Sequence, residues 1–185
     1  PFTVGYLGSA GQGYLFEPVL DLFLEIQRLK PDARLKIVNR KDHVFIQELL
    51  NAHKTDPAAV ELLSCDYPEV PKKMGDMDIG LFFYQWKKTH VSSVPTRMGE
   101  FLACGVPCLS HVGGAGIIEI LEKEGGGVVL RNFDAQSIRN AAVAAIDLAT
   151  DNERRIRCTE SAKRHFSLEA GVKTYEKVYC DLEKI

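Results

Sequence analysis

Residues Ser92 to Gly116 read SSVPTRMGEFLACGVPCLSHVGGAG and combine groups that could bind an anion. We predict a short helix here, with Ser93 as the N-cap and Pro95 in the first turn, where a missing N–H costs nothing. The helix must stop at Gly105, because Pro107 follows, which leaves about three turns. Its first turn presents free backbone N–H groups and the positive end of the helix dipole, so it suits a phosphate group.

Glu100 stands one turn into that predicted helix, between apolar neighbours. Such a carboxylate is poorly placed as a solvated charge, and we expect it to accept two sugar hydroxyls of a nucleotide whose phosphates lie at the helix start. A surface or capping carboxylate is the alternative, just as Arg97 could be an ordinary cation on an exposed helix face. Gly113 and Gly114 open the following helix and offer a second set of backbone N–H donors.

A second glycine-rich turn, GSAGQG, spans residues Gly8 to Gly13 between a predicted strand and a predicted helix. Its spacing is not GxGxxG, and no acidic residue closes the next strand, which ends IVNRK. A P-loop sequence is also absent. The pattern therefore disfavours a nicotinamide cofactor and leaves a phosphate-binding turn or a merely permissive tight turn.

Short β-branched and aromatic runs alternate with helical periodicity, which predicts βαβ units and an α/β fold. We expect six strands, at about residues 3–8, 34–39, 59–64, 79–84, 107–110 and 127–130. Together they predict a Rossmann-like, doubly wound six-stranded parallel sheet with helices on both faces. The last third of the chain holds three helical blocks and predicts a helical C-terminal tail.

Apolar residues from Leu15 to Leu29 recur at three- and four-residue steps and predict the first helix, which Pro31 ends. Candidate N-caps introduce the later helices. They are Asp42 before a helix at 43–52, then Asp134, Asp151 or Asn152, and Ser167 in the tail.

The composition predicts one globular domain over residues 1–185, with 45% hydrophobic and 26% charged residues. The formal net charge of −2 gives no reason to expect a nucleic-acid or anionic-membrane surface. The five cysteines include no CxxC pair and resemble reduced thiols, so we expect a cytoplasmic protein. The chain does not begin with Met, and we expect it to be part of a longer protein.

Several segments together resemble the C-terminal, donor-binding domain of GT-B glycosyltransferases, in the retaining family 4 (glycosyl transferases group 1). The resemblance covers nearly the whole chain, and PTRMGEFLACGVPC is its most specific motif. The other matching segments are VGYLGS, LKIVN, YPEVPKKMGDMDIGLFFY, the continuation to GGAGIIEIL, GGGVVLRNFDAQSIRNAA and FSLEAGVKTYEKVY.

The resemblance implies a role for each matching residue. Glu100 matches the second glutamate of a Glu-x7-Glu motif that binds the ribose hydroxyls. Thr96 and Arg97, with Pro95 shaping the helix start, match the site of the diphosphate. Gly113 and Gly114 match the loop near the donor sugar, and residues 64–67, including Asp66, match the wall that holds the base.

Two departures from the family pattern concern the donor site. Ser92 occupies the position of the first motif glutamate, so His90 or Ser93 is expected to supply part of the sugar contact. The family's Arg and Lys after the first strand are also missing, and Gly8 and Ser9 lie in that loop instead. The cations that could replace them are Arg40, Lys41, Lys87, Lys88 and Arg97.

The resemblance implies a retaining glycosyltransferase of the kind used in polysaccharide biosynthesis, with a nucleoside-diphosphate sugar as donor. The acceptor would bind the protein's own N-terminal domain, absent here, so the chain alone should bind donor without turnover. We expect no metal or other cofactor and assign no catalytic residue. Peripheral membrane association would come only through the missing half.

Two alternatives remain open. One is a degenerate nucleotide-sugar-binding module without activity. The other is a GT-B-type nucleotide-sugar epimerase, whose acid/base carboxylates would have to be Asp66, Glu69 and Glu100.

Overall fold

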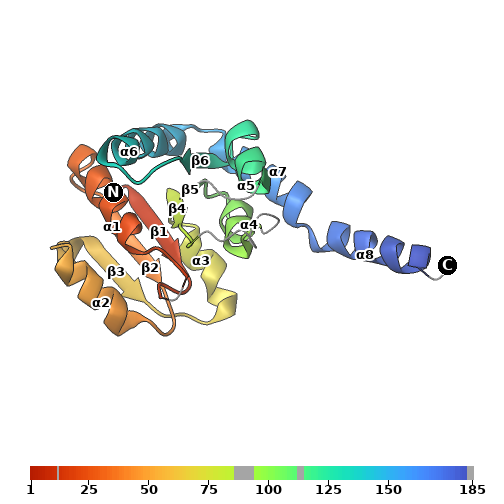
Figure 1. Cartoon of the computed structure of the whole chain (residues 1–185), viewed down its shortest axis with the longest axis horizontal. Coiled ribbons are helices and arrows are strands. Elements are labelled where there is room, and N and C mark those ends of the chain that lie inside the picture. The colour runs from red at the N-terminus through yellow and green to blue at the C-terminus, as the bar shows by residue number, and fades with distance from the viewer. Residues whose placement is uncertain (12, 86–93, 112–114, 183–185) are drawn as a thin grey trace.

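The computed structural model describes residues 1–11, 13–85, 94–111 and 115–182. Its centre is a parallel sheet of six strands in the order β3-β2-β1-β4-β5-β6 (Figure 1). The strands are β1 (Thr3–Leu7), β2 (Arg34–Val38), β3 (Val60–Leu63), β4 (Ile79–Phe82), β5 (Cys108–His111) and β6 (Gly127–Leu130). The strand order reverses between β1 and β4. The predicted six-stranded α/β fold is therefore confirmed, with small differences at the strand ends.

Helices cover both faces of the sheet, as predicted. Two separate apolar cores form, one under α1, α2 and α6 and the other under α3, α4, η4 and α7. The helices are α1 (Glu17–Leu29), α2 (His43–Ala52), α3 (Val70–Met74), α4 (Thr96–Ala103), α5 (Ala115–Ile118), α6 (Ala135–Thr150), α7 (Arg154–Phe166) and α8 (Leu168–Leu182). Two 3-10 turns, η1 (Pro57–Ala59) and η2 (Tyr67–Glu69), and a π-helical turn, η4 (Glu119–Lys123), complete the described elements.

The stripe predicted for α1 faces the first core, where Val19, Phe23 and Ile26 are fully buried. Leu29, the last residue of the predicted stripe, is 45% exposed. It is also the last residue of the helix, which ends there before Pro31. The 3.6-residue period thus identifies the buried face, but not where the sheet stops covering it.

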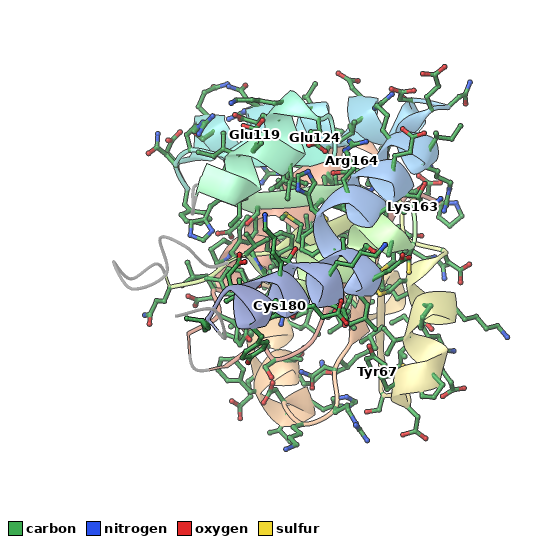
Figure 2. The ribbon with its side chains drawn as sticks, turned by 90° about the vertical axis from the view of Figure 1, so that its right-hand side faces the viewer. Tyr67, Glu119, Glu124, Lys163, Arg164 and Cys180 are labelled. Atoms are coloured by element: carbon green, nitrogen blue, oxygen red, sulfur yellow. The ribbon has the colours of Figure 1, made fainter. Side chains whose placement is uncertain are left out.

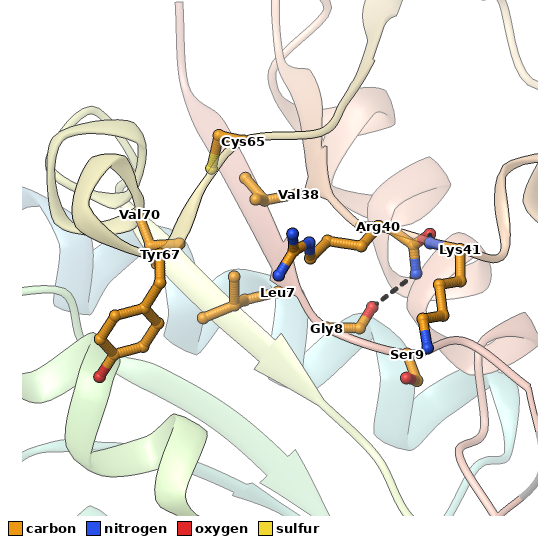
Figure 3. A pocket seen from close by; sticks show the side chains of 10 residues that line it. Leu7, Gly8, Ser9, Val38, Arg40, Lys41, Cys65, Tyr67 and Val70 are labelled. Carbon is orange, nitrogen blue, oxygen red and sulfur yellow. Dashed lines mark hydrogen bonds between the residues drawn. The ribbon is translucent and has the colours of Figure 1, made fainter.

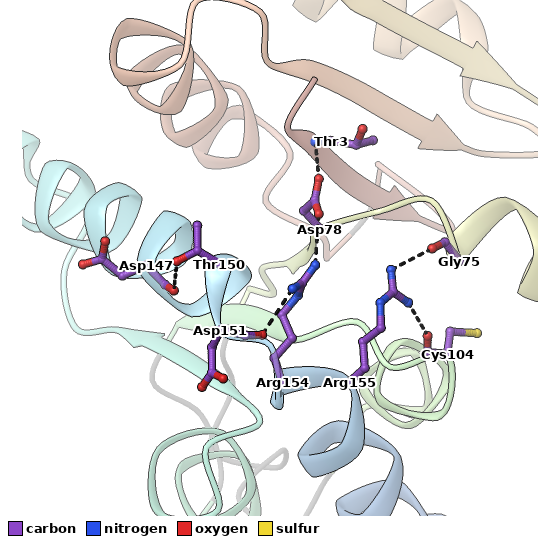
Figure 4. Close-up of polar contacts among 9 residues, drawn as sticks. All are labelled: Thr3, Gly75, Asp78, Cys104, Asp147, Thr150, Asp151, Arg154 and Arg155. Atoms are coloured by element: carbon purple, nitrogen blue, oxygen red, sulfur yellow. Dashed lines mark hydrogen bonds and ion pairs between the residues drawn. The ribbon is translucent and has the colours of Figure 1, made fainter.

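Helix α4 is held against α7 on the second face of the sheet. A Cβ on Gly99 would lie 2.6 Å from the ring of Phe166, so only glycine allows the two helices to pack this closely. Arg155 of α7 donates to Cys104 O at the end of α4 (3.4 Å) and to Gly75 O (3.1 Å), as Figure 4 shows. These contacts fix the position of α4 from behind.

The start of α7 is joined to the sheet through Asp78. Asp78 accepts hydrogen bonds from Arg154 (3.3 Å) and from the backbone N–H of Thr3 (2.9 Å) (Figure 4). Asp151 is not the N-cap, nor is Asn152: the N-cap position belongs to Glu153, and Asp151 accepts from Glu153 N in the preceding turn. Asp151 also pairs with Arg157, so its carboxylate is engaged at a position before the N-cap residue.

The other predicted N-caps of the tail are confirmed. Asp134 accepts from the N–H groups of Gln136 and Ser137, and Ser167 Oγ accepts from Ala170 N. Helix α8 then projects away from the rest of the molecule (Figure 1). None of its residues is buried, and its exposed apolar residues are Leu168, Val172, Tyr175, Val178, Tyr179 and Leu182. Within the described residues we find no helix with the length and apolar character to cross a bilayer.

Glu124, which follows η4, links this segment to the end of α7 (Figure 2). It accepts hydrogen bonds from Ser161 (2.6 Å) and Arg164 (2.8 Å), and His165 Nε2 lies 2.7 Å from its other oxygen. Burial acts to raise the pKa of Glu124, but these hydrogen bonds and the charge of His165 outweigh it and lower the pKa to about 2. The ionised carboxylate therefore stabilises the fold.

We predict that Glu124→Gln lowers the free energy of unfolding by about 1–3 kcal/mol at pH 7, because it removes hydrogen bonds to a charged group. The folded pKa lies below the ordinary value of 4.5. The contribution is thus complete above about pH 4.5 and is lost as the pH falls towards 2. Thermal unfolding followed by circular dichroism at pH 7, 5 and 3 measures the effect.

Glu119→Gln is the matched control, because Glu119 only pairs with Lys123 on the surface of the same segment. Its melting temperature should stay near that of the wild type. A gap between Glu124→Gln and wild type that does not shrink at acid pH would contradict the role of the carboxylate.

Candidate functional site

The reversal of strand order between β1 and β4 places two loops side by side at the carboxyl edge of the sheet, where ligands bind in folds of this kind. Backbone hydrogen bonds join them, from Leu15 N to Phe83 O (3.0 Å) and from Gln85 N to Gly13 O (2.7 Å). An isolated bridge pairs Tyr14 with Tyr84 between these two contacts. The loop after β1 is thus fixed against the segment after β4.

A pocket of about 300 Å³ opens at the carboxyl ends of β1 and β2 (Figure 3). Tyr67 lies on one side of it and Ser9 and Lys41 on the other. The pocket is lined by Leu7, Gly8, Ser9, Val38, Asn39, Arg40, Lys41, Cys65, Tyr67 and Val70. Cys65 and Tyr67 come from the segment predicted to hold the base. Asp66 itself points outward and pairs with Arg40 at 3.6 Å.

The turn at residues 8–10 is held by two side chains that follow β2. Asn39 Nδ2 donates to Gly8 O (2.9 Å) and to Asp42 Oδ2 (3.0 Å), and the same Asp42 oxygen accepts from Ala10 N (2.9 Å). The hydrogen bonds from Ala10 and Asn39 lower the pKa of Asp42. Asp42 does stand before α2, as predicted, but its carboxylate makes no capping bond to the helix and holds the neighbouring loop instead.

Arg97 lies at the start of α4 and is only 7% exposed, so it is not a cation on an exposed helix face. Its guanidinium carbon is 4.6 Å from the ring centre of Tyr14, 5.3 Å from that of Tyr6 and 5.9 Å from that of Tyr84. Nη1 is buried without a hydrogen-bond partner in the described part of the chain. The side chain reaches the turn after β1, since a Cβ on Gly8 would lie 2.4 Å from Nη2.

Glu100 is half-buried on α4, one turn after Thr96. It lines a broader cleft of about 1010 Å³. The cleft residues are Tyr67, Thr96, Gly99, Glu100, Ala103, Thr159, Ala162, Lys163, Phe166, Ser167 and Leu168. Tyr67 and Lys163 are labelled in Figure 2. Because Tyr67 lines both the pocket and the cleft, the two cavities adjoin each other there.

Helix α4 differs from its prediction in its start and its length. Pro95, with φ −65° and ψ 128°, occupies the N-cap position, and Thr96 is the first helical residue. Ser93 is therefore not the N-cap. The helix has eight residues rather than three full turns, and Gly105 follows with φ 72°. An extended Pro95 delays the start of the helix by two residues relative to a cap at Ser93.

The structure brings Gly8 and Arg97 together at the switch point, with Ser9 on the pocket and Thr96 and Glu100 on the adjoining cleft. Other predicted site residues lie outside the described residues: His90, Ser92, Ser93, Gly113 and Gly114, together with the candidate cations Lys87 and Lys88. The three tyrosines around Arg97 and the role of Asn39 were not predicted from the sequence. Their only signal was position, since Tyr14 and Tyr84 fall in or beside loops that follow strands.

Comparisons with solved structures place this fold among glycosyltransferases. A variant of S. aureus TarM in complex with fondaparinux, α-GlcNAc-glycerol and UDP matches with a TM-score of 0.76 and 12% identity, over 96% of this chain and 35% of that one. A glycosyltransferase from Rickettsia africae matches with a TM-score of 0.74 and 16% identity, over 99% of this chain and 48% of that one. The pneumococcal O-GlcNAc transferase GtfA, in complex with UDP and GlcNAc, matches with a TM-score of 0.68 and 14% identity, over 97% of this chain and 36% of that one.

The chain thus spans between 35% and 48% of the length of these three neighbours. No protein-family model matches the sequence. No curated protein matches it either. At these identities the comparisons establish a fold shared with glycosyltransferases.

We predict that Gly8→Ala lowers the free energy of unfolding by about 1–3 kcal/mol, because an L side chain is strained at this backbone conformation. The φ of Gly8 is +96°, and the new Cβ would collide with the buried guanidinium of Arg97. Urea unfolding measures the change.

Gly11→Ala is the control in the same loop, because nothing lies within 4 Å of a Cβ there and its φ is not positive. Its unfolding free energy should stay within about 0.5 kcal/mol of wild type. Equal effects of the two substitutions would show that neither the φ of Gly8 nor the position of Arg97 constrains this turn.

Proposed function

We propose that this chain is the donor-binding domain of a retaining GT-B glycosyltransferase of family 4 and binds a nucleoside-diphosphate sugar. The observation that carries the proposal is the buried guanidinium of Arg97 beneath Gly8, beside the N-terminus of α4, whose Nη1 has no hydrogen-bond partner among the described residues. A buried charged group with an unsatisfied donor is costly, and a bound anion relieves that cost. The exposed backbone N–H groups at the start of a helix attract the same kind of ligand.

The two cavities suggest how the donor lies. In our proposal the diphosphate contacts Arg97, Thr96 and the turn containing Gly8 and Ser9. Glu100, one turn further along α4, accepts the ribose hydroxyls, and the base enters the pocket lined by Cys65 and Tyr67. The shared position of Tyr67 supports this order, because the ribose must lie between diphosphate and base.

The chemical contribution of the site is electrostatic. Negative charge accumulates on the diphosphate as the bond to the sugar breaks, and donors already aimed at that charge lower the barrier. Arg97 and the N–H groups of α4 supply positive charge without a metal ion. We propose that the acceptor binds an N-terminal domain of a longer protein, and that transfer in the cytoplasm serves polysaccharide biosynthesis.

Contacts to the donor sugar are proposed from the family resemblance alone. They involve His90, Ser92, Ser93, Gly113 and Gly114. With Ser92 in place of a glutamate, these groups offer the sugar neutral hydrogen bonds and at most the charge of His90. We propose that this difference affects which sugar is accepted more than whether a nucleotide binds.

Two of the three carboxylates that an epimerase would need are engaged elsewhere. Asp66 pairs with Arg40 at 3.6 Å, and Glu69 accepts from Asp66 N at 3.3 Å, so both hold the η2 turn and its surroundings. Both are exposed. This arrangement favours donor binding for transfer over acid/base chemistry on the sugar.

We predict that Glu100→Gln weakens binding of the nucleotide sugar by about 1–3 kcal/mol, because the ribose hydroxyls lose a charged acceptor. Isothermal titration with UDP, GDP, ADP and their sugars, first on wild type and then on the variant, measures the loss. The melting temperature should change little, since Glu100 lines an open cleft.

Glu48→Gln, on an exposed position of α2, is the matched control and should bind like wild type. Unchanged affinity of Glu100→Gln would reject the ribose assignment. Absence of binding heat for every nucleotide with wild type would favour the degenerate module.

A further inference from the structure

Three tyrosines surround the guanidinium of Arg97, and we call Tyr6, Tyr14 and Tyr84 the tyrosine cluster. They come from three separate segments: β1, the loop after it, and the segment after β4. Their ring centres lie between 4.6 and 5.9 Å from the guanidinium carbon, which is the distance range of cation–π interactions. One arginine thus contacts three separate chain segments at the switch point.

Two phenols of the tyrosine cluster supply no negative charge. Burial raises the pKa of Tyr6, with the charge of Arg97 and a side-chain hydrogen bond with Arg97 acting against it, and burial also raises the pKa of Tyr84. Tyr6 and Tyr84 therefore remain neutral at physiological pH. Among the described residues Nη1 of Arg97 has no hydrogen-bond partner.

The tyrosine cluster is itself held in place. Tyr6 OH donates to Ser9 O at 2.5 Å, and the ring of Tyr6 packs edge-on against Phe16. Tyr14 and Tyr84 are bridged through their backbones, and their ring centres are 5.4 Å apart. The rings can therefore define one position for the guanidinium and remove most of the freedom of its long side chain.

We propose that the tyrosine cluster consists of positioning residues that hold Arg97 ready for the diphosphate of the donor, an inference that rests on the function proposed above. The loop from Gly8 to Tyr14 contains no Lys or Arg. Arg97 belongs to α4, which covers the other face of the sheet, and its buried guanidinium supplies a positive charge at that turn. Aromatic faces rather than a carboxylate hold it, which leaves Nη1 for a phosphate oxygen.

The test compares two substitutions at Tyr14, whose ring lies nearest to the guanidinium. Tyr14→Phe keeps the aromatic face and should bind the nucleoside diphosphate like wild type. Tyr14→Leu removes that face and should weaken binding by about 3- to 30-fold. The probe is whichever of UDP, GDP and ADP binds wild type most tightly, titrated by calorimetry.

Two further measurements separate positioning from a general loss of structure. The matching nucleoside, followed by ligand-observed NMR competition, should bind Tyr14→Leu as it binds wild type, because it lacks the diphosphate. In an Arg97→Gln background, Tyr14→Leu should cause no additional loss of diphosphate affinity, since the two residues act through one contact. The pair Tyr84→Phe and Tyr84→Leu repeats the comparison at a second ring.

The outcomes distinguish the two proposals. If no nucleoside diphosphate binds wild type, the proposed function fails. If wild type binds it and the Leu variants bind it equally well, or lose nucleoside and diphosphate affinity in the same proportion, the positioning role is overturned and the function stands. Loss of affinity in Tyr14→Phe equal to that in Tyr14→Leu would likewise overturn it, because the aromatic face would then be irrelevant.

Discussion

The positive charge of Arg97 lies where the fold already concentrates positive charge. The N-terminus of α4 carries the positive end of its helix dipole and has no acidic residue in its first turn, and the guanidinium adds a full charge beside it, with Nη1 unpaired within the described residues. This arrangement is unfavourable by itself, so it must be held by contacts made elsewhere. Phe101 and Leu102 of α4 are buried in the second core, and Gly99 allows α7 to pack closely against the helix.

The position of the site follows from the order of the strands. Tyr6 belongs to the core under α1, whereas α4 covers the other face of the sheet. Side chains from opposite faces can meet only at an edge, and the carboxyl edge between β1 and β4 is where the loops diverge and leave room. The contact between Arg97 and the tyrosines therefore crosses from one layer of the fold to the other. Any movement of α4 relative to β1 would change the distance between the Arg97 guanidinium and the ring of Tyr6.

The sequence predicts much of this fold because its signals are local. Most strands are short runs that contain β-branched residues, and Asp134 and Ser167 cap helices through neighbours two or three residues away. Asp42 shows where this reasoning ends. Its helix begins as predicted, but Ala10, distant in sequence, takes the hydrogen bond that a local pattern assigns to the helix.

The candidate site was predictable in part for the same reason. Thr96, Arg97 and Glu100 belong to one contiguous motif, which identifies them as a group. The burial of Arg97 depends on rings supplied by three distant segments, and periodicity alone marks Tyr6 only as a core residue. The sequence alone does not show that a cation lies against the ring of Tyr6, because that contact is made by a distant residue.

Helix α8 shows what happens where no layer covers an apolar stripe. All of its described side chains are exposed, so the burial that stabilises the sheet adds nothing to its helical state. A helix of this length is marginal in water without tertiary packing. Its amide hydrogens should therefore exchange with solvent through a local opening that leaves both cores intact. The helical state of α8 and the fold of the domain are two separate equilibria within one chain.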